Sequence, residues 1–431
     1  MKIRKAWLVT GVAVATLGML GLAGCSSSTD APAEGGKTTL TMWHNSTTGD
    51  GKAYWEDAAA AFHKENPDVT IKLTSIQNED MDGKLQTAVN SGDMPDIFMA
   101  RGGGKLADIV SADKVKDLTG LIDPDVKKAL GDAPFSAFTV DGKIYGMPSA
   151  VLPGGFFYSK DLFEQAGITS EPTTMDELNG AVTKLKDAGI QPIALGAKAA
   201  WPAAHWYYFF AVRACDQGLI ENLATKADFS DPCWLEAAKN FEEFAGTQPF
   251  NKGFLTTDPQ EGANSSAGLL ANHKAAMELM GAWDVGVIAS LTPDTKPLPD
   301  LGWFPFPEVD GGAGAPGAMM GGVDGYSCSK DSPASCEKFL NFVSSKEWQE
   351  KYAVAFQTIP ASQEATGAVT DPSLVPLMEA FTKAPYVALW LDTALGQNVG
   401  NALNTSVVEM LAGQGTPEKL VETVTKAQAR G

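Results

Sequence analysis

The sequence predicts an α/β protein whose chain forms two domains joined by several crossing segments. At about 150 residues per domain, its 431 residues correspond to two or three domains. Strands alternate with helices near the N-terminus, and helices between short apolar strands dominate from about residue 200. Hydrophobic residues make up 44% and charged residues 20% of the chain, which argues against a largely disordered chain or a membrane bundle.

The N-terminal elements follow from hydrophobic periodicity. Alternation of apolar and polar residues predicts strands over residues 38–43 and 69–74, and an apolar run predicts a buried strand over residues 96–100. Helical periodicity predicts helices over residues 51–64 and 80–90 between these strands. Strands separated by single helices form βαβ units, so we expect a parallel sheet.

Helix start signals recur along the rest of the chain. Capping boxes, in which Ser or Thr precedes Glu by three residues, occur at Thr174 with Glu177 and at Ser344 with Glu347. Thr416, which stands before a proline, predicts the start of the last helix.

The charge balance excludes some classes of partner. With 33 Lys and Arg against 52 Asp and Glu, the formal net charge is −19, and an acidic surface repels phosphate backbones. Nucleic-acid binding is therefore not expected. Only four histidines are present and they are scattered, so we expect neither a metal site nor a cofactor.

The N-terminus has the pattern of an export signal. Lys2, Arg4 and Lys5 form a positive region, and an apolar stretch over residues 6–23 follows. Leu-Ala-Gly-Cys at residues 22–25 resembles a bacterial lipobox, which implies cleavage after residue 24 and a diacylglycerol on Cys25. An ordinary signal peptide or a membrane anchor is the alternative.

The segment that follows the lipobox is of low complexity. Residues 25–36 are rich in Ser, Pro, Gly and Ala, which cannot bury enough surface to fold, so we expect a lipidated tether. Loss of the signal peptide removes three cations and moves the net charge from −19 to −22.

The remaining cysteines are Cys215, Cys233, Cys328 and Cys336, which allow three disulfide connectivities. The local pairs 215–233 and 328–336 close short loops and are favoured in an exported protein. A zinc site built from all four cysteines is the alternative, although the chain contains no C-x-x-C pair.

The chain carries no recognisable catalytic motif. There is no G-x-S-x-G, no H-E-x-x-H and no Walker A loop. The glycines at residues 102–104, followed by Lys105, lack the spacing of a phosphate-binding loop and are interpreted as a flexible turn. A pair of carboxylates suited to a glycosidase cannot be recognised in a sequence with 52 of them.

Aromatic residues beside hydrogen-bonding residues at element ends are the strongest functional signal. They occur as Trp43-His44-Asn45, in the helix that begins near Trp201, as Trp283-Asp284 and as Trp390-Leu391-Asp392. Flat rings cover the apolar face of a pyranose, while carboxylates, amides and imidazoles pair its hydroxyls. This pattern indicates sugar recognition.

Each of these residues also has a structural interpretation. Trp206, Trp234, Trp303 and Trp348 are expected in the core, whereas Trp43, Trp283 and Trp390 fit the core and a ligand site equally well. His44 and His205 are candidates to face a ligand, and His63 and His273 are expected at the surface. Asp96 could bind ligand or cap the turn before its strand.

Six segments together resemble a known family. They cover residues 40–73, 91–100, 141–148, 156–168, 172–178 and 275–286. With the lipobox, their order is similar to that of the sugar-binding proteins of ABC importers, bacterial extracellular solute-binding family 1. The resemblance implies an α/β, two-lobed periplasmic-binding-protein fold with three hinge crossovers and a ligand cleft between the lobes. It also implies a non-enzymatic, monomeric receptor that delivers sugar to membrane permease subunits.

The resemblance places lobe one at residues 37–148 and 324–355, and lobe two at residues 153–320 and 360–431. Hinges are expected at residues 148–153 and 321–324 and at Ile359. The implied ligand-binding residues are His44, Asn45, Asp96, His205, Trp283, Asp284, Asp324, Tyr326, Trp390 and Asp392. Of these, His205, Asp324 and Tyr326 rest on their position and not on a motif.

Within this family the chain most resembles actinobacterial binders of α-1,6-linked oligosaccharides of the raffinose or isomaltose type. A binder of maltose, xylose oligomers or cellobiose would show the same length and hinge pattern. The other hypotheses are a secreted carbohydrate-active hydrolase and a structural surface lipoprotein or adhesin without a small ligand.

Overall fold

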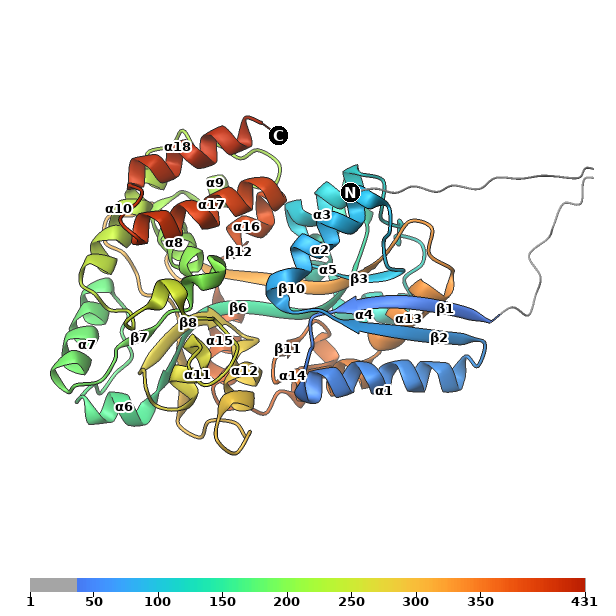
Figure 1. Ribbon diagram of the computed structural model, residues 1–431, viewed down its shortest axis with the longest axis horizontal. Helices are drawn as coiled ribbons and strands as arrows, with labels where there is room; N and C mark the ends of the chain where they lie inside the picture. The colour runs from blue at the N-terminus through green and yellow to red at the C-terminus, as the bar shows by residue number, and fades with distance from the viewer. Residues whose placement is uncertain (1–36, 431) are drawn as a thin grey trace, which may run out of the picture. The chain divides into compact units, whose positions relative to one another are not determined.

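The computed structural model describes residues 37–430, and its N-terminal part is built on three parallel strands (Figure 1). β1 (Thr38–His44) lies between β2 (Val69–Ser75) and β3 (Ile97–Ala100). Helix α1 (Gly49–Glu65) connects β1 to β2, and α2 (Asn78–Ser91) connects β2 to β3. All five predicted elements are present, with ends within about two residues of the predicted ones.

The complete sheet is mixed, which corrects the expectation of a parallel one. Its strand order is β2-β1-β3-β10-β6-β8-β7, and both β3–β10 and β10–β6 are antiparallel pairs. The prediction came from the first two βαβ units, and the sheet beyond them is not formed by such units. The strands that complete it are β6 (Met147–Ser159), β7 (Ile193–Ala194), β8 (Met277–Gly281), β9 (Leu301–Phe304), β10 (Met319–Cys328), β11 (Ile359–Pro360) and β12 (Val387–Leu389).

The three segments predicted as hinges lie side by side. β6 and β10 pair in antiparallel register from Gly321 opposite Pro153 to Asp324 opposite Ala150. β11 lies on the other side of β6, with Ile359 opposite Val151. In Figure 1 these strands run between the blue N-terminal strands and β8. The three predicted hinge segments therefore meet at one place in the fold.

Helices surround the sheet along the described chain, and the last two of them pack on other helices. Those before β7 are α3 (Gly103–Ser111), α4 (Pro124–Leu130), α5 (Asp132–Ser136), α6 (Lys160–Gln165) and α7 (Met175–Asp187). A two-stranded hairpin, β4 (Thr139–Val140) with β5 (Lys143–Ile144), lies between α5 and β6. The later ones are α8 (Trp201–Ala214), α9 (Gln217–Glu221), α10 (Cys233–Gly246), α11 (Ser266–Ala271), α12 (Asp284–Leu291), α13 (Ser335–Val343), α14 (Lys346–Phe356), α15 (Leu374–Lys383), α16 (Leu391–Ala394), α17 (Gly396–Leu411) and α18 (Pro417–Gln428), with short 3₁₀ turns at Ala197–Ala199, Phe254–Thr256 and Gln363–Ala368.

Two of the three predicted caps are present. Thr174 and Thr416 accept hydrogen bonds at 3.2 Å from the backbone N–H groups at the starts of α7 and α18. The Glu177 carboxylate accepts from the N–H of Thr173, one residue before the expected partner. The cap at Ser344 is wrong, because this residue ends α13 in a helical conformation and Ser345 precedes α14.

The hydrophobic core is divided into separate clusters. One surrounds α1, β1 and α14, and a larger one surrounds α8, α10 and α17. The predicted core tryptophans are confirmed, since Trp206 and Trp234 are 0% exposed and Trp303 and Trp348 are 4% exposed. Both predicted disulfides, Cys215–Cys233 and Cys328–Cys336, are present.

The predicted signal peptide, the lipidated Cys25 and the tether lie outside the described residues. Among the helices over residues 37–430, none is both long and apolar enough to cross a membrane.

Candidate ligand-binding site

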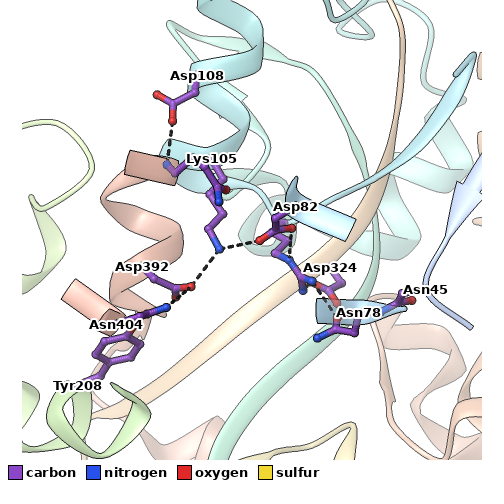
Figure 2. Close-up of polar contacts among 11 residues, drawn as sticks. Asn45, Asn78, Asp82, Lys105, Asp108, Tyr208, Asp324, Asp392 and Asn404 are labelled. Atoms are coloured by element: carbon purple, nitrogen blue, oxygen red, sulfur yellow. Dashed lines mark hydrogen bonds and ion pairs between the residues drawn. The ribbon is translucent and has the colours of Figure 1, made fainter. Parts of the chain in front are cut away.

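Five charged side chains meet where α2, α3, β10 and α16 converge, and we call them the charge cluster (Figure 2). Lys105 Nζ lies 3.0 Å from Oδ2 of Asp82 and 3.0 Å from Oδ2 of Asp392. Arg101 Nε lies 2.9 Å from Oδ1 of Asp82, and its Nη1 lies 3.9 Å from Oδ1 of Asp324. The cluster therefore joins residues 82–105 to side chains more than 200 positions later in the sequence.

Amide side chains extend the charge cluster at both ends (Figure 2). Asn78 accepts hydrogen bonds from Arg101 Nη2 at 2.8 Å and from the Asn45 amide at 3.3 Å. At the other end the Asn404 amide donates to Asp392 at 3.5 Å, and its oxygen accepts from the Tyr208 hydroxyl. The result is a continuous polar chain from β1 to α8.

The cations keep two carboxylates ionised, the partly buried Asp82 and the buried Asp392. Burial opposes ionisation of Asp82, but Arg101 and Lys105 hold its pKa below the ordinary value. Asp392 is also buried, and Lys105 holds its pKa below the ordinary value in the same way. Burial raises the pKa of Asp324 despite the attraction of Arg101. Two ionised carboxylates thus face two cations.

An aromatic group lies next to Asp392. The rings of His205 and Trp390 stack at a centroid distance of 4.1 Å, with 9° between their planes. Trp283 meets Trp390 edge to face at 6.0 Å, and Trp201 lies 6.1 Å from Trp283. Burial lowers the pKa of His205 to about 3, so its imidazole is neutral at physiological pH. The stacked His205–Trp390 pair and the edge-to-face Trp283–Trp390 pair are the two arrangements that aromatic rings prefer.

Glycines on the crossing strands make room for the tryptophans. A Cβ on Gly154 of β6 would lie 2.6 Å from the Trp390 ring, and one on Gly322 of β10 would lie 2.7 Å from it. A Cβ on Gly281, at the end of β8, would lie 1.9 Å from the Trp283 ring. Any larger residue at these three positions would displace the indoles.

The structure brings six of the predicted site residues to this region. Asn45 and Asp324 belong to the polar chain, while His205, Trp283 and Trp390 form the aromatic group and Asp392 joins the two. Trp390 is 7% exposed, whereas Trp283 is only partly buried. Of the two candidate tryptophans in the aromatic group, Trp283 is therefore the one with exposed surface to offer a sugar.

Two other predicted residues near this region pack inward. His44 is 1% exposed. Its Nδ1 accepts a hydrogen bond from the backbone N–H of Ser46, and its Nε2 lies 3.4 Å from the Ser75 hydroxyl. Asp284 is fully buried at the start of α12, and burial raises its pKa to about 8. Their neighbours Asn45 and Trp283 reach the polar chain and the aromatic group instead.

Asp96 and Tyr326 are not brought to the charge cluster. Asp96 precedes β3, and its carboxylate accepts from the backbone N–H of Thr41 at 2.7 Å and from the Thr41 hydroxyl at 2.8 Å. It thus joins β1 to β3 at the amino end of β3, whereas Arg101 follows the carboxyl end. Tyr326 is 5% exposed and packs edge to face on Trp55 at 4.7 Å.

Sequence reasoning missed Asp82, Arg101 and Lys105 as members of this region, whereas Trp201 stood in one of the noted aromatic segments. Lys105 was part of a noted motif, but the three glycines before it were interpreted as a flexible turn. That interpretation is wrong, because Gly103 and Gly104 begin α3 and pack against α16. Arg101 directly follows a predicted buried strand, which was the available signal for it.

A separate group could in principle coordinate a metal ion. Ligand atoms of Asp161, His273 and Asp300 lie within 4.8 Å of one another. His273 Nε2 lies 3.0 Å from both carboxylate oxygens of Asp300, a hydrogen-bonding contact that accounts for the arrangement without a metal ion. His273 is exposed, as expected.

Comparison with known proteins identifies the family. Residues 45–350 match the family model for bacterial extracellular solute-binding proteins. The chain belongs to this family. Its members are solute-binding proteins and not enzymes, which confirms the family resemblance and the non-enzymatic prediction. An uncharacterized ABC transporter extracellular-binding protein of Pyrococcus horikoshii is 24% identical over 341 residues, covering 77% of this chain and 74% of the relative.

Solved structures confirm the predicted fold class. A structure described with xylan utilization by Caldanaerobius polysaccharolyticus has a TM-score of 0.82 and 26% identity, covering 91% of this chain and 99% of its own. A chitin oligosaccharide binding protein has a TM-score of 0.79 and 28% identity, covering 91% of this chain and 98% of its own. This chain thus has the two-lobed α/β fold of these binding proteins.

Proposed function

We propose that this chain is the receptor of an ABC importer and captures a neutral oligosaccharide at the charge cluster and the aromatic group. The arrangement of these two groups carries the proposal. Trp283 offers a ring for the apolar face of a sugar, and the ionised Asp82 and Asp392 offer acceptors for its hydroxyls. Similarity to a chitin oligosaccharide binding protein and to an ABC transporter binding protein supports the same assignment.

The charge balance of the site favours a neutral ligand. Asp82 and Asp392 face Arg101 and Lys105, burial raises the pKa of Asp324 and so favours its neutral form, and His205 is neutral. An anionic or cationic ligand would add an uncompensated charge to a partly buried region, which costs free energy. A neutral sugar adds none.

The proposed lobes are residues 37–148 with 324–355 and residues 153–320 with 360–431, joined where β6, β10 and β11 lie side by side. Lys105 and Asp392 then belong to different lobes, so their ion pair would form as the cleft closes. Closure around the sugar would shift the population from open to closed. The lipid on Cys25 would anchor a monomeric receptor beside its permease subunits.

Within this function, we propose an α-1,6-linked galactoside or glucoside of the raffinose or isomaltose type. Maltose, xylose and chitin oligosaccharides are the competing ligands. The ligand class is tested by isothermal titration calorimetry and thermal shift on the soluble chain from residue 37, with raffinose, isomaltose, maltotriose, xylotriose and chitobiose. We expect heat and a raised melting temperature with one of these sugars, at a dissociation constant of about 1 μM.

The panel also separates the remaining alternatives. Chromatography of the sugars after prolonged incubation with the protein should show no shortened product. Tighter binding of maltotriose, xylotriose or chitobiose than of raffinose and isomaltose would overturn the α-1,6 assignment. The proposal that the chain is an oligosaccharide receptor would still hold. If none of the five sugars binds, the proposal that the chain captures an oligosaccharide is contradicted.

A further inference from the structure

We propose that Lys105 is a positioning residue of the ligand site, which holds the carboxylates of Asp82 and Asp392 in place as paired hydrogen-bond acceptors for sugar hydroxyls. This inference rests on the proposed function. It also assigns a role to the segment of three glycines that precedes Lys105, which the fold alone does not explain.

The contacts of Lys105 place it between two distant parts of the chain. Its ammonium lies 3.0 Å from Asp82 on α2 and 3.0 Å from Asp392 on α16, and its side chain is only 11% exposed. A buried ammonium at hydrogen-bonding distance from two carboxylates fixes the orientation of both. No other cation of residues 37–430 lies within ion-pair distance of Asp392.

Asp392 retains hydrogen-bonding capacity toward a ligand. The bonds from Lys105 and Asn404 both go to Oδ2. An ionised carboxylate accepts on both oxygens, at about four positions in total, so Oδ1 can accept from a sugar hydroxyl. A cavity of about 30 Å³ adjoins Lys105, Arg101 and Asp82, which is room for a water molecule and not for a sugar. We therefore place the sugar ring on the side of Asp392 that faces the aromatic group, with Asp82 reaching a sugar hydroxyl through the water-sized cavity.

The glycines before Lys105 allow α3 to approach α16 closely. A Cβ on Gly103 would lie 2.4 Å from the Leu389 side chain, and one on Gly104 would lie 2.4 Å from the backbone oxygen of Ala394. Any side chain at Gly104 would push the first turn of α3 away from α16. The glycines thus set the distance that Lys105 spans to Asp392.

The same helix makes a second contact with the C-terminal segment. The Asp108 carboxylate accepts a hydrogen bond at 2.9 Å from the backbone N–H of Gln397, at the start of α17 (Figure 2). This contact joins α3 to the same region without touching Asp82 or Asp392. Asp108 therefore offers a matched control that weakens the helix contact and leaves the ammonium in place.

Other charged and titratable groups also face Lys105 and its partners. They are Arg101, Asp324 of β10, and His205 and Tyr208 of α8. His205, with its pKa lowered to about 3 by burial, and Tyr208, with its pKa raised by burial, do not change charge between pH 5 and 8. Arg101 stays protonated. Burial raises the pKa of Asp324 and Lys105 lowers it, so loss of the cation in Lys105→Met acts on this carboxyl in the same direction as on Asp82 and Asp392, whereas Lys105→Arg and Asp108→Asn keep the cation.

The test compares sugar affinity by calorimetry at pH 5 and pH 8 for the wild type, Lys105→Met, Lys105→Arg and Asp108→Asn, with the sugar that the panel identifies. We expect the wild type, Lys105→Arg and Asp108→Asn to bind almost equally at the two pH values. Lys105→Met should bind at least tenfold more weakly, and its affinity should rise with pH, because burial without the cation favours the protonated carboxyls.

A uniform loss of affinity in Lys105→Met, with the same dependence on pH as the wild type, would overturn the proposal. The proposal would also be overturned if Asp108→Asn changed the pH dependence of sugar affinity as much as Lys105→Met does. Gly104→Ala, which moves the helix and keeps the ammonium, should reproduce the pH dependence of Lys105→Met in weaker form.

A measurement without sugar separates this inference from the proposed function. The difference in melting temperature between the wild type and Lys105→Met should grow from pH 4 to pH 8. In the wild type the lowered pKa of Asp392 gives stability that is present above its ordinary pKa and lost as the pH falls, and in the variant the sign reverses. If no sugar binds, the receptor proposal fails while this readout still decides the role of Lys105. If the melting temperatures of the wild type and Lys105→Met differed by the same amount at pH 4 and pH 8, the proposed role of Lys105 would be disproved.

Discussion

Two buried groups of acidic residues in this protein have opposite electrostatic environments. In the charge cluster, Asp82 and Asp392 lie at 3.0 Å from the Lys105 ammonium and keep lowered pKa values. Glu278 at 2% exposure and Asp284 at 0% exposure have unpaired carboxylate oxygens, and burial raises both pKa values. Burial penalises charge in both places, and only a nearby cation reverses its effect. A buried carboxylate is thus an acceptor in one region and an acid in the other.

Removing a cation from the charge cluster should have the largest effect. In Arg101→Met, Asp82 and Asp324 lose their shared guanidinium and remain largely buried, so we expect a loss of about 3 kcal/mol in the free energy of unfolding. Urea denaturation at pH 7 measures it. Arg101→Lys, which keeps the charge and loses the planar geometry, should lose less. Equal stability of the wild type and Arg101→Met would show that the ion pairs contribute nothing.

Neutralising the second group should have the opposite sign. The folded pKa of Asp284, about 8, lies above the ordinary value of 3.8, so its contribution to stability is present at low pH and lost as the pH rises toward 8. Asp284→Asn removes this loss, and we expect it to be more stable than the wild type by about 2 kcal/mol at pH 8 and by much less at pH 4.

Thermal or urea denaturation at the two pH values checks this second prediction. The exposed Asp57→Asn on α1 serves as the control and should leave the pH dependence unchanged. If Asp284→Asn were instead less stable than the wild type at pH 8, Asp284 would be ionised and paired, and the comparison of the two regions would not hold.

The smallest expected effect concerns the aromatic side of the site. Trp283→Ala should weaken sugar binding at least tenfold, or about 1.4 kcal/mol, and leave the circular dichroism spectrum unchanged, because the ring is partly exposed and lies next to the charge cluster. Trp283→Phe keeps an aromatic surface and should retain most of the affinity. Unchanged binding by Trp283→Ala would leave the carboxylates as the main determinants.

Much of the fold could be predicted from local pattern. Residues 38–100 have regular periodicity, so the βαβ order and its boundaries were readable, and the two disulfides followed from short spacing. The antiparallel pairing of β6 with β10 could not be predicted, because its partners are separated by more than 150 residues. Pairing at that distance depends on the rest of the fold.

The candidate site shows the same division. Trp283, Trp390 and Asp392 were found because aromatic and polar residues are adjacent in the sequence at element ends. Asp82 and Lys105 were missed because each is an ordinary charged residue on a helix, and on a helix such residues are usually solvated. Their role depends on the 3.0 Å contact of Lys105 with Asp392, which lies 287 positions away.

The sequence by itself determined the α/β class, the disulfide pairs and the aromatic residues beside hydrogen-bonding ones, because composition, spacing and periodicity are local properties. Its ordered motifs also carried the resemblance to the family. Tertiary structure decided which acidic residues stay ionised. Asp96, Asp284 and Asp392 are the same amino acid, and they become a strand-joining contact, a buried acid and a paired carboxylate. The physical reason is that the charge of a buried carboxyl depends on the groups that the fold places around it.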